Sequence, residues 1–65
     1  MRYYTVTALD ADDCTVSSYE SGYNRREAKR EALDTLHGDD ELREAGMVRV
    51  TVTDEAGEVW EDIRL

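Results

Sequence analysis

The sequence predicts an α+β domain of the order β-β-α-β-β, in which one helix covers one face of a four-stranded, mainly antiparallel sheet. Two observations predict this fold class. Apolar residues alternate with polar ones in four short segments, as in strands with one buried face. Between the second and third segments they recur at the 3.6-residue spacing of an amphipathic helix. With 65 residues and no Pro, the chain is expected to form a single domain, residues 1–65.

The first hairpin is expected to join strands 2–9 and 14–20 through an Asp-rich turn at 10–13. Aromatic and β-branched residues dominate the first strand and favour this structure. Asp favours turns because its side chain can bond to its own backbone. Alternation then places Cys14 and Val16 on the inner face of the second strand.

The helix is expected over 25–37. Asn24 followed by Glu27 forms the capping-box pattern at its start, and Gly38 stands where a left-handed C-cap is expected. The apolar stripe of this helix consists of Ala28, Ala32, Leu33 and Leu36. The two alanines would allow a close approach to the sheet.

The second hairpin is expected to join strands 47–53 and 58–65 through a turn at 54–57. An acidic connection at 39–46, with a short helical turn, leads into it. Alternation is clear in the third strand but loses phase in the fourth, which a β-bulge near residues 61–62 would correct.

Alternation assigns each strand residue to one of two faces. The inner face, under the helix, is assigned Tyr4, Val6, Ala8, Val16, Val48, Val50, Val52, Val59 and Ile63. The open face, which no helix covers, is assigned Tyr3, Thr5, Thr7, Thr15, Ser17, Tyr19, Met47, Arg49, Thr51, Thr53 and Trp60.

The chain is strongly acidic, with 16 Asp and Glu against eight Lys and Arg and a formal net charge of -8. Such a charge repels nucleic acid and anionic membranes and attracts basic surfaces. The expected partner is therefore a basic protein surface, with no direct binding to nucleic acid or membrane. Arg25 and Arg26 are expected to pair with the turn at 54–58.

Seven carboxylates are expected to gather at the other end of the fold, without cationic partners, and are the first candidate site. They are Asp10, Asp12 and Asp13 in the first turn and Asp39, Asp40, Glu41 and Glu44 after the helix.

The open face of the sheet is the second candidate binding site. Tyr and Trp are enriched at the centres of protein interfaces, so Tyr3, Tyr19 and Trp60 are candidate anchors. A homodimer through this face is an alternative to a foreign partner.

No catalytic, cofactor-binding or metal-binding constellation is predicted. The only His, His37, ends the helix, where a cation complements the helix dipole, and Cys14 is expected to be a small buried residue. A single Cys allows no internal disulfide, and no long apolar segment marks a signal peptide or membrane span. A non-enzymatic, cytoplasmic protein is expected.

In layout the chain resembles small phage and mobile-element proteins, including anti-CRISPR inhibitors in which hairpins flank a helix. The resemblance is carried by the segments 3–6 (YYTV), 26–30 (REAKR) and 57–62 (GEVWED). It implies a protein that blocks the nucleic-acid path or a subunit surface of a CRISPR effector, acidic members imitating DNA.

The first half also resembles HicB-type antitoxins, through the Asp12-Asp13 turn between two strands and a helix with Glu27-Ala28 and 31–33 (EAL). The Pro-rich segment of that family has no counterpart, because the chain contains no Pro.

The leading interpretation is a small acidic binding module that inhibits or sequesters a basic nucleic-acid-handling protein by occlusion, as a mobile-element inhibitor of the anti-CRISPR type would. A HicB-like antitoxin is one alternative. A structural homodimer from a salt-adapted organism, with no inhibitory role, is another, since seven Arg stand beside one Lys and acidic residues abound.

Overall fold

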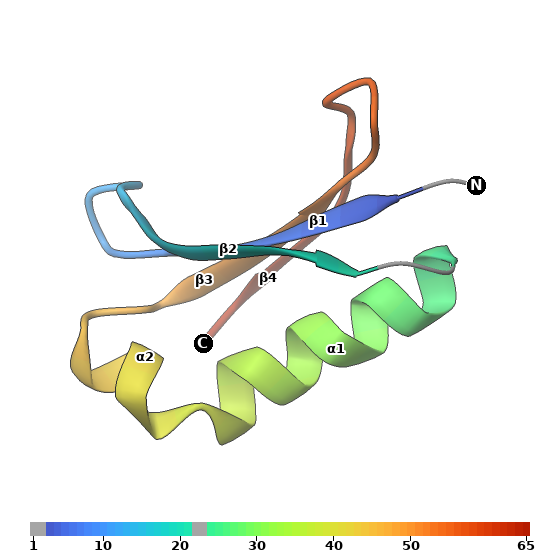
Figure 1. Ribbon diagram of the computed structural model, residues 1–65. Coiled ribbons are helices and arrows are strands. Elements are labelled where there is room, and N and C mark those ends of the chain that lie inside the picture. Colours follow the sequence, from blue (N-terminus) through green and yellow to red (C-terminus); the bar gives the residue numbers. More distant parts are fainter. Residues whose placement is uncertain (1–2, 22–23) are drawn as a thin grey trace.

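The computed structural model describes residues 3–21 and 24–65, which form one four-stranded sheet and two helices (Figure 1). The elements follow in the order β1 (Tyr4–Leu9), β2 (Thr15–Ser21), α1 (Arg25–Gly38), α2 (Asp40–Glu44), β3 (Arg49–Thr53) and β4 (Val59–Arg64). The strands are ordered β2-β1-β3-β4 and every neighbouring pair is antiparallel. The predicted ββαββ layout is confirmed, and the expected helical turn after α1 is the short helix α2. The expected start of the first strand at Arg2 lies outside the described residues.

Helix α1 lies across one face of the sheet and leaves the other face open (Figure 1). Asn24 caps it by accepting a hydrogen bond from the Glu27 backbone N–H at 2.9 Å. The small side chains of Ala28 and Ala32, both fully buried, face the sheet together with Leu36. The helix can therefore approach the central strands closely, as the sequence predicts.

The end of α1 differs from the sequence prediction. Gly38 is the last helical residue and does not adopt a positive φ; among the glycines in the described ranges, Gly46 and Gly57 do. Asp39, with φ −96°, is both the C-cap of α1 and the N-cap of α2. A left-handed residue is not needed because the chain passes directly from one helix into the next.

A β-bulge at Val16 reverses the predicted faces of the part of β2 that follows it, whereas Thr15 and Val16 keep theirs. Ala8 pairs with Ser17 and Leu9 with Thr15, so Val16 is an extra residue between them. Beyond the bulge, Tyr19 pairs with Val6 and faces the helix. Cys14 is exposed rather than buried, because the inward positions begin only after the turn, at the bulge.

A second bulge lies in β4, one residue before the predicted position. Val52 pairs with Glu61 and Thr53 with Val59, so Trp60 is the extra residue. Glu61 faces the helix in phase with Ile63, and the bulge moves Val59 to the open face, with 55% of its surface exposed. The expectation that Val59 belongs to the core is therefore wrong.

The buried core contains Tyr4, Val6, Ala8, Ala28, Ala32, Leu36, Met47, Val50 and Val52, with Val16, Tyr19, Leu42 and Ile63 partly buried against it. Met47 and Val48 exchange their predicted roles. The Met47 N–H bonds to the Leu42 carbonyl, which turns this residue inward before β3 begins, and Met47 is buried whereas Val48 is exposed.

The two hairpin turns have the same hydrogen-bonding pattern and backbone conformation. In each turn an Asp side-chain oxygen accepts two backbone N–H groups at 2.9 Å: Asp10 from residues 12 and 14, and Asp54 from residues 56 and 58. The fourth turn residue has a positive φ, 83° at Gly57 and 61° at Asp13. This combination of a turn followed by a left-handed residue is typical of three-residue hairpin loops.

Replacing Tyr19 by Phe tests the reversed face of β2. The Tyr19 hydroxyl lies 2.7 Å from Thr35 Oγ1 on α1, so removing it should lower the free energy of unfolding by about 1 kcal/mol. Urea denaturation measures the change. Tyr3→Phe is the matched control, because the Tyr3 ring is 45% exposed and should leave the stability unchanged. Equal effects of the two substitutions would contradict the assigned face.

Tyr19→Phe should also reduce the loss of stability at alkaline pH. Burial raises the pKa of Tyr19, as do the nearby Glu31, Asp34 and Asp39 carboxylates, while the bond with Thr35 opposes the shift. A phenol with a raised pKa stabilises the fold below its ordinary pKa, and this contribution is lost as the pH rises through the folded value.

Candidate functional site

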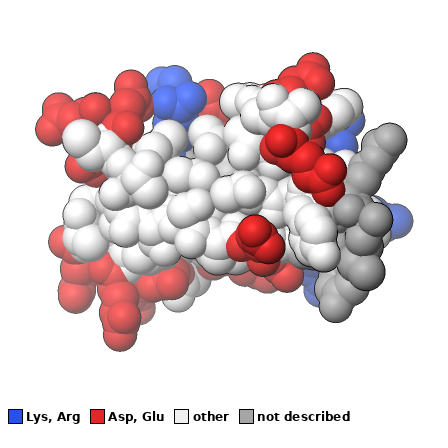
Figure 2. Space-filling view, turned by 45° about the horizontal axis from the view of Figure 1, so that its top comes forward, with Lys and Arg blue, Asp and Glu red and all other residues white. Residues whose placement is uncertain are grey.

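The two acidic segments meet at one end of the molecule. Figure 1 shows the turn between β1 and β2 and the short helix α2 at the same end, and Figure 2 shows acidic side chains gathered there. The contact is close, since a Cβ added to Gly46 after α2 would lie 3.6 Å from the Asp10 Cβ. We call this region, formed by Asp10, Asp12, Asp13, Asp39, Asp40, Glu41 and Glu44, the acidic end.

Two carboxylates of the acidic end hold the local backbone. Asp10 Oδ1 accepts the N–H groups of Asp12 and Cys14 in the turn. Asp39 Oδ1 accepts the Leu42 N–H at 3.1 Å and so caps α2. Both residues are therefore needed for the structure of the segments that carry the charge.

Two further carboxylates form ion pairs, which the sequence analysis did not predict. Arg49 Nη1 lies 2.9 Å from Asp13 Oδ1, and Arg43 Nη2 lies 2.8 Å from Asp40 Oδ1. The expectation that the whole cluster lacks cationic partners is therefore wrong for Asp13 and Asp40. Arg43 is three residues after Asp40 on α2, a spacing that brings side chains together on a helix.

The other three carboxylates of the acidic end neither bind backbone groups nor form ion pairs among the described residues. The side chains of Asp12, Glu41 and Glu44 are exposed, and within residues 3–21 and 24–65 they form no hydrogen bond or ion pair. They come from both segments of the acidic end. Exposed carboxylates of this kind are available to a cationic partner without first breaking an internal contact.

Arg49 connects the acidic end to the open face of the sheet. Besides its contact with Asp13, it donates from Nε and Nη2 to the two carboxylate oxygens of Asp62 on β4, at 2.7 and 2.8 Å. This two-pronged geometry is the strong form of an Arg–carboxylate pair. The hydrogen bonds from Arg49 hold the pKa of Asp62 below its ordinary value.

The cations at the start of α1 form ion pairs with a different carboxylate from those predicted. Arg25 and Lys29 lie 3.8 and 3.9 Å from Oε1 of Glu61, which faces the helix from β4. The expected pairing of Arg25 and Arg26 with the turn at 54–58 is therefore replaced by pairing of Arg25 with the strand.

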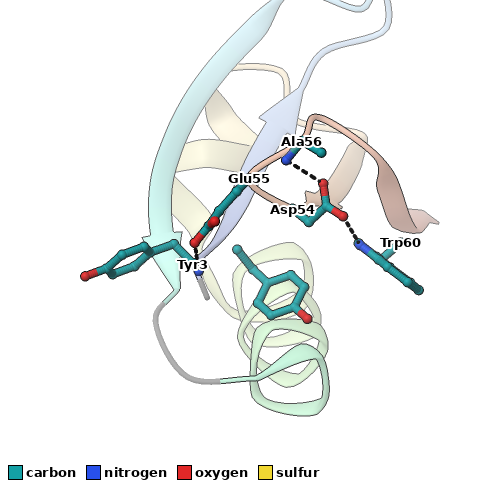
Figure 3. A pocket seen from close by; sticks show the side chains of 6 residues that line it. Tyr3, Asp54, Glu55, Ala56 and Trp60 are labelled. Carbon is teal, nitrogen blue, oxygen red and sulfur yellow. Dashed lines mark hydrogen bonds between the residues drawn. The ribbon is translucent and has the colours of Figure 1, made fainter. Parts of the chain in front are cut away.

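The three aromatic candidates do not form one surface. Tyr19 is partly buried against α1, and the bulged Trp60 lies beside the helix start, with the Arg25 guanidinium 4.5 Å from its ring centre. Tyr3 is 45% and Trp60 36% exposed, and the Tyr3 ring points away from Trp60 (Figure 3). Two of the proposed anchors of an open-face interface are thus engaged elsewhere.

The open face itself is largely hydroxylated. Thr5 pairs with Thr53 and Thr7 with Thr51 across the central strands, and the Thr7 and Ser18 hydroxyls lie 3.4 Å apart. Such a surface offers less apolar area than a predicted row of Tyr and Trp. The open face thus offers few of the aromatic contacts predicted for it.

Comparisons of the chain with protein-family models, curated proteins and solved structures gave no match. In the described part of the chain, no helix has the length and apolar character needed to cross a membrane. Nor do three or more His, Cys, Asp or Glu side chains of these residues converge as metal ligands would. The functional proposal therefore depends on the charge and geometry of the acidic end.

Replacing Arg49 by Gln tests the network that borders the acidic end. The pKa of Asp62 should rise toward its ordinary value, because the hydrogen bonds that favour the carboxylate are lost. Following the Asp62 side-chain carbon by NMR during an acid titration measures this. Arg64→Gln is the control, since its single contact with Asp62 is 3.9 Å long and its removal should have the smaller effect.

The same substitution should flatten the acid dependence of stability. A carboxyl with a lowered pKa stabilises the fold above its ordinary pKa, and this contribution disappears as the pH falls through the folded value. Wild-type protein should therefore lose more stability than Arg49→Gln between neutral and strongly acidic pH. An unchanged Asp62 titration would show that Arg49 does not hold this carboxylate in solution.

Proposed function

We infer that the protein is a non-enzymatic binding module whose acidic end contacts a basic surface of another protein. One observation carries the proposal: the fold brings Asp12, Glu41 and Glu44, all exposed and without internal partners among the described residues, to the same end from two separate segments. Around them lie Asp13 and Asp40, whose ion pairs leave their side chains 73% and 85% exposed.

Electrostatics favours rapid capture of such a partner. A net charge of -8 on 65 residues steers a basic protein toward the molecule, and clustering the charge at one end orients the encounter. Because the acidic end is solvated, its charges contribute mainly to the association rate and to salt sensitivity.

The narrower form of the proposal is inhibition of a nucleic-acid-handling protein by occlusion. A groove lined with Lys and Arg binds phosphates largely through charge, so a rigid group of carboxylates competes for the same groove. The layout resemblance to anti-CRISPR inhibitors supports this class of partner. The proposal places the protein in the cytoplasm, where an exposed thiol such as Cys14 remains reduced.

Reversing the three unpaired carboxylates tests the proposal. The variant D12K/E41K/E44K spares Asp10 and Asp39, which hold the backbone, and the paired Asp13 and Asp40. It should fold normally but lose the partner that wild-type protein retains from a lysate of its source cell. The captured partner is then purified, and duplex DNA should compete with the wild-type protein for it, with affinity falling steeply as salt rises.

The matched control is E20K/E27K/E58K, which changes the net charge by the same amount. These three glutamates are exposed, and their side chains have no bonding partner in the described part of the chain. They lie toward the opposite end of the fold. Partner binding should survive in this variant. Equal loss in both variants would mean that total charge alone matters, and equal retention would remove the acidic end from consideration.

A further inference from the structure

A hollow of about 340 Å³ lies at the end of the molecule opposite the acidic end. It is lined by Tyr3, Tyr4, Asp54, Glu55, Ala56 and Trp60, where the turn between β3 and β4 approaches the start of β1 (Figure 3). Its volume is at the lower limit for small-molecule sites. An aromatic wall beside two carboxylates is an unusual lining, and it defines the chemistry that the hollow can accept.

The aromatic wall is held in place by the turn. Trp60 Nε1 donates to Asp54 Oδ2 at 2.8 Å, and Asp54 Oδ1 accepts the Ala56 and Glu58 N–H groups. Glu55 Oε1 in turn accepts the Tyr3 backbone N–H at 3.0 Å. The indole and the carboxylates therefore keep a fixed relation, which a preformed binding site requires.

The Trp60 ring already binds one cation inside the molecule. The Arg25 guanidinium carbon lies 4.5 Å from the ring centre, within the range of a cation–π contact. Arg25 is not among the residues that line the hollow, whereas Trp60 is. Trp60 remains 36% exposed beside this contact.

The hydrogen bonds of the lining select among cations. Both oxygens of Asp54 and one oxygen of Glu55 already accept N–H groups from the protein. A guanidinium would have to share these oxygens with the protein's own N–H groups, and a hydrated metal ion prefers oxygen ligands to aromatic carbon. A methylated ammonium has few or no N–H donors, and its apolar methyl groups suit an aromatic wall.

We propose that the hollow between the β3–β4 turn and β1 is a binding site for a methylated ammonium group, with Trp60 as the aromatic wall and Glu55 as the counter-charge. The group is either that of a small free cation or that of a methylated lysine side chain. This site shares no residue with the acidic end and does not depend on the function proposed for it.

Choline chloride is the first probe, and 3,3-dimethyl-1-butanol, which has carbon in place of the charged nitrogen, is its neutral control. Choline should shift the Trp60 indole N–H resonance in a saturable manner, with weak affinity in the millimolar range, and the alcohol should not. Equal shifts by both compounds would show an apolar hollow without preference for cations. The absence of a saturable shift with choline would overturn the site.

Glu55→Gln should weaken choline binding about two- to five-fold, the effect of one charge at an exposed site. Glu58→Gln, in the same turn but outside the hollow, is the matched control and should bind as wild type does. Trp60→Phe lacks the indole, so its binding is followed through the backbone amides of Glu55 and Ala56; it should weaken binding further, with an unchanged amide spectrum elsewhere showing that the fold is kept. Equal binding by the Glu55 and Glu58 variants would refute the assigned counter-charge.

A short peptide with one trimethyllysine separates the two sources of the ligand. Tighter binding of this peptide than of choline, with no binding of the unmodified peptide, would assign the site to a modified protein. Equal affinities would assign it to a small free cation. The D12K/E41K/E44K variant should bind choline as wild type does, so this proposal and the acidic-end proposal can fail separately.

Discussion

The packing of α1 on the sheet depends on the register of the two edge strands, and a β-bulge sets that register on each side. Without the extra residue Val16, Tyr19 would face solvent and could not reach Thr35 on the helix. Without the extra residue Trp60, Val59 would lie on the inner face in phase with Glu61 and Ile63, as the sequence predicts. A one-residue shift exchanges the two faces of a strand. The two bulges thus decide which side chains of the edge strands join the helix and which are exposed.

The sequence predicts the faces of the central strands correctly but not those of the edge strands. Alternation of apolar and polar residues is unbroken in the central strands and interrupted by a bulge in each edge strand. In β1 and β3 alternation continues unbroken through Val6, Val50 and Val52, which are fully buried as predicted. In β2, however, either phase places an apolar side chain inward, so Val16 concealed the bulge and Tyr19 was assigned to the wrong face. In β4 the adjacent Val59 and Trp60 signalled a loss of phase but not its position. Two neighbouring apolar residues in a strand are a usable signal of a bulge, although its exact position depends on tertiary packing.

The sequence predicted where the acidic end lies, but not which of its carboxylates have partners within the protein. Its position follows from connectivity, because a hairpin turn and the C-terminal end of a helix that returns across the sheet must meet. Composition does not show which of these carboxylates bind backbone groups and which form ion pairs. Asp10 and Asp39 hold backbone groups, and Asp13 is bound by an Arg49 that arrives from a strand 36 residues away in sequence. Only local pairs such as Asp40 with Arg43 could have been inferred from helical spacing.

The surplus of charge at the acidic end follows from where the fold places its cations. Glu61 faces α1 and has two of the helix cations beside it, and Arg49 is shared between Asp62 and Asp13. Among the described residues, Arg43 and Arg49 are the cations that pair with α2 and the turn. The remaining carboxylates repel one another, which raises the free energy of the folded protein. Salt screening reduces this repulsion, and binding of a basic protein would relieve it. The charge left exposed at the acidic end is therefore a consequence of where the described Lys and Arg residues lie and which carboxylates they pair with.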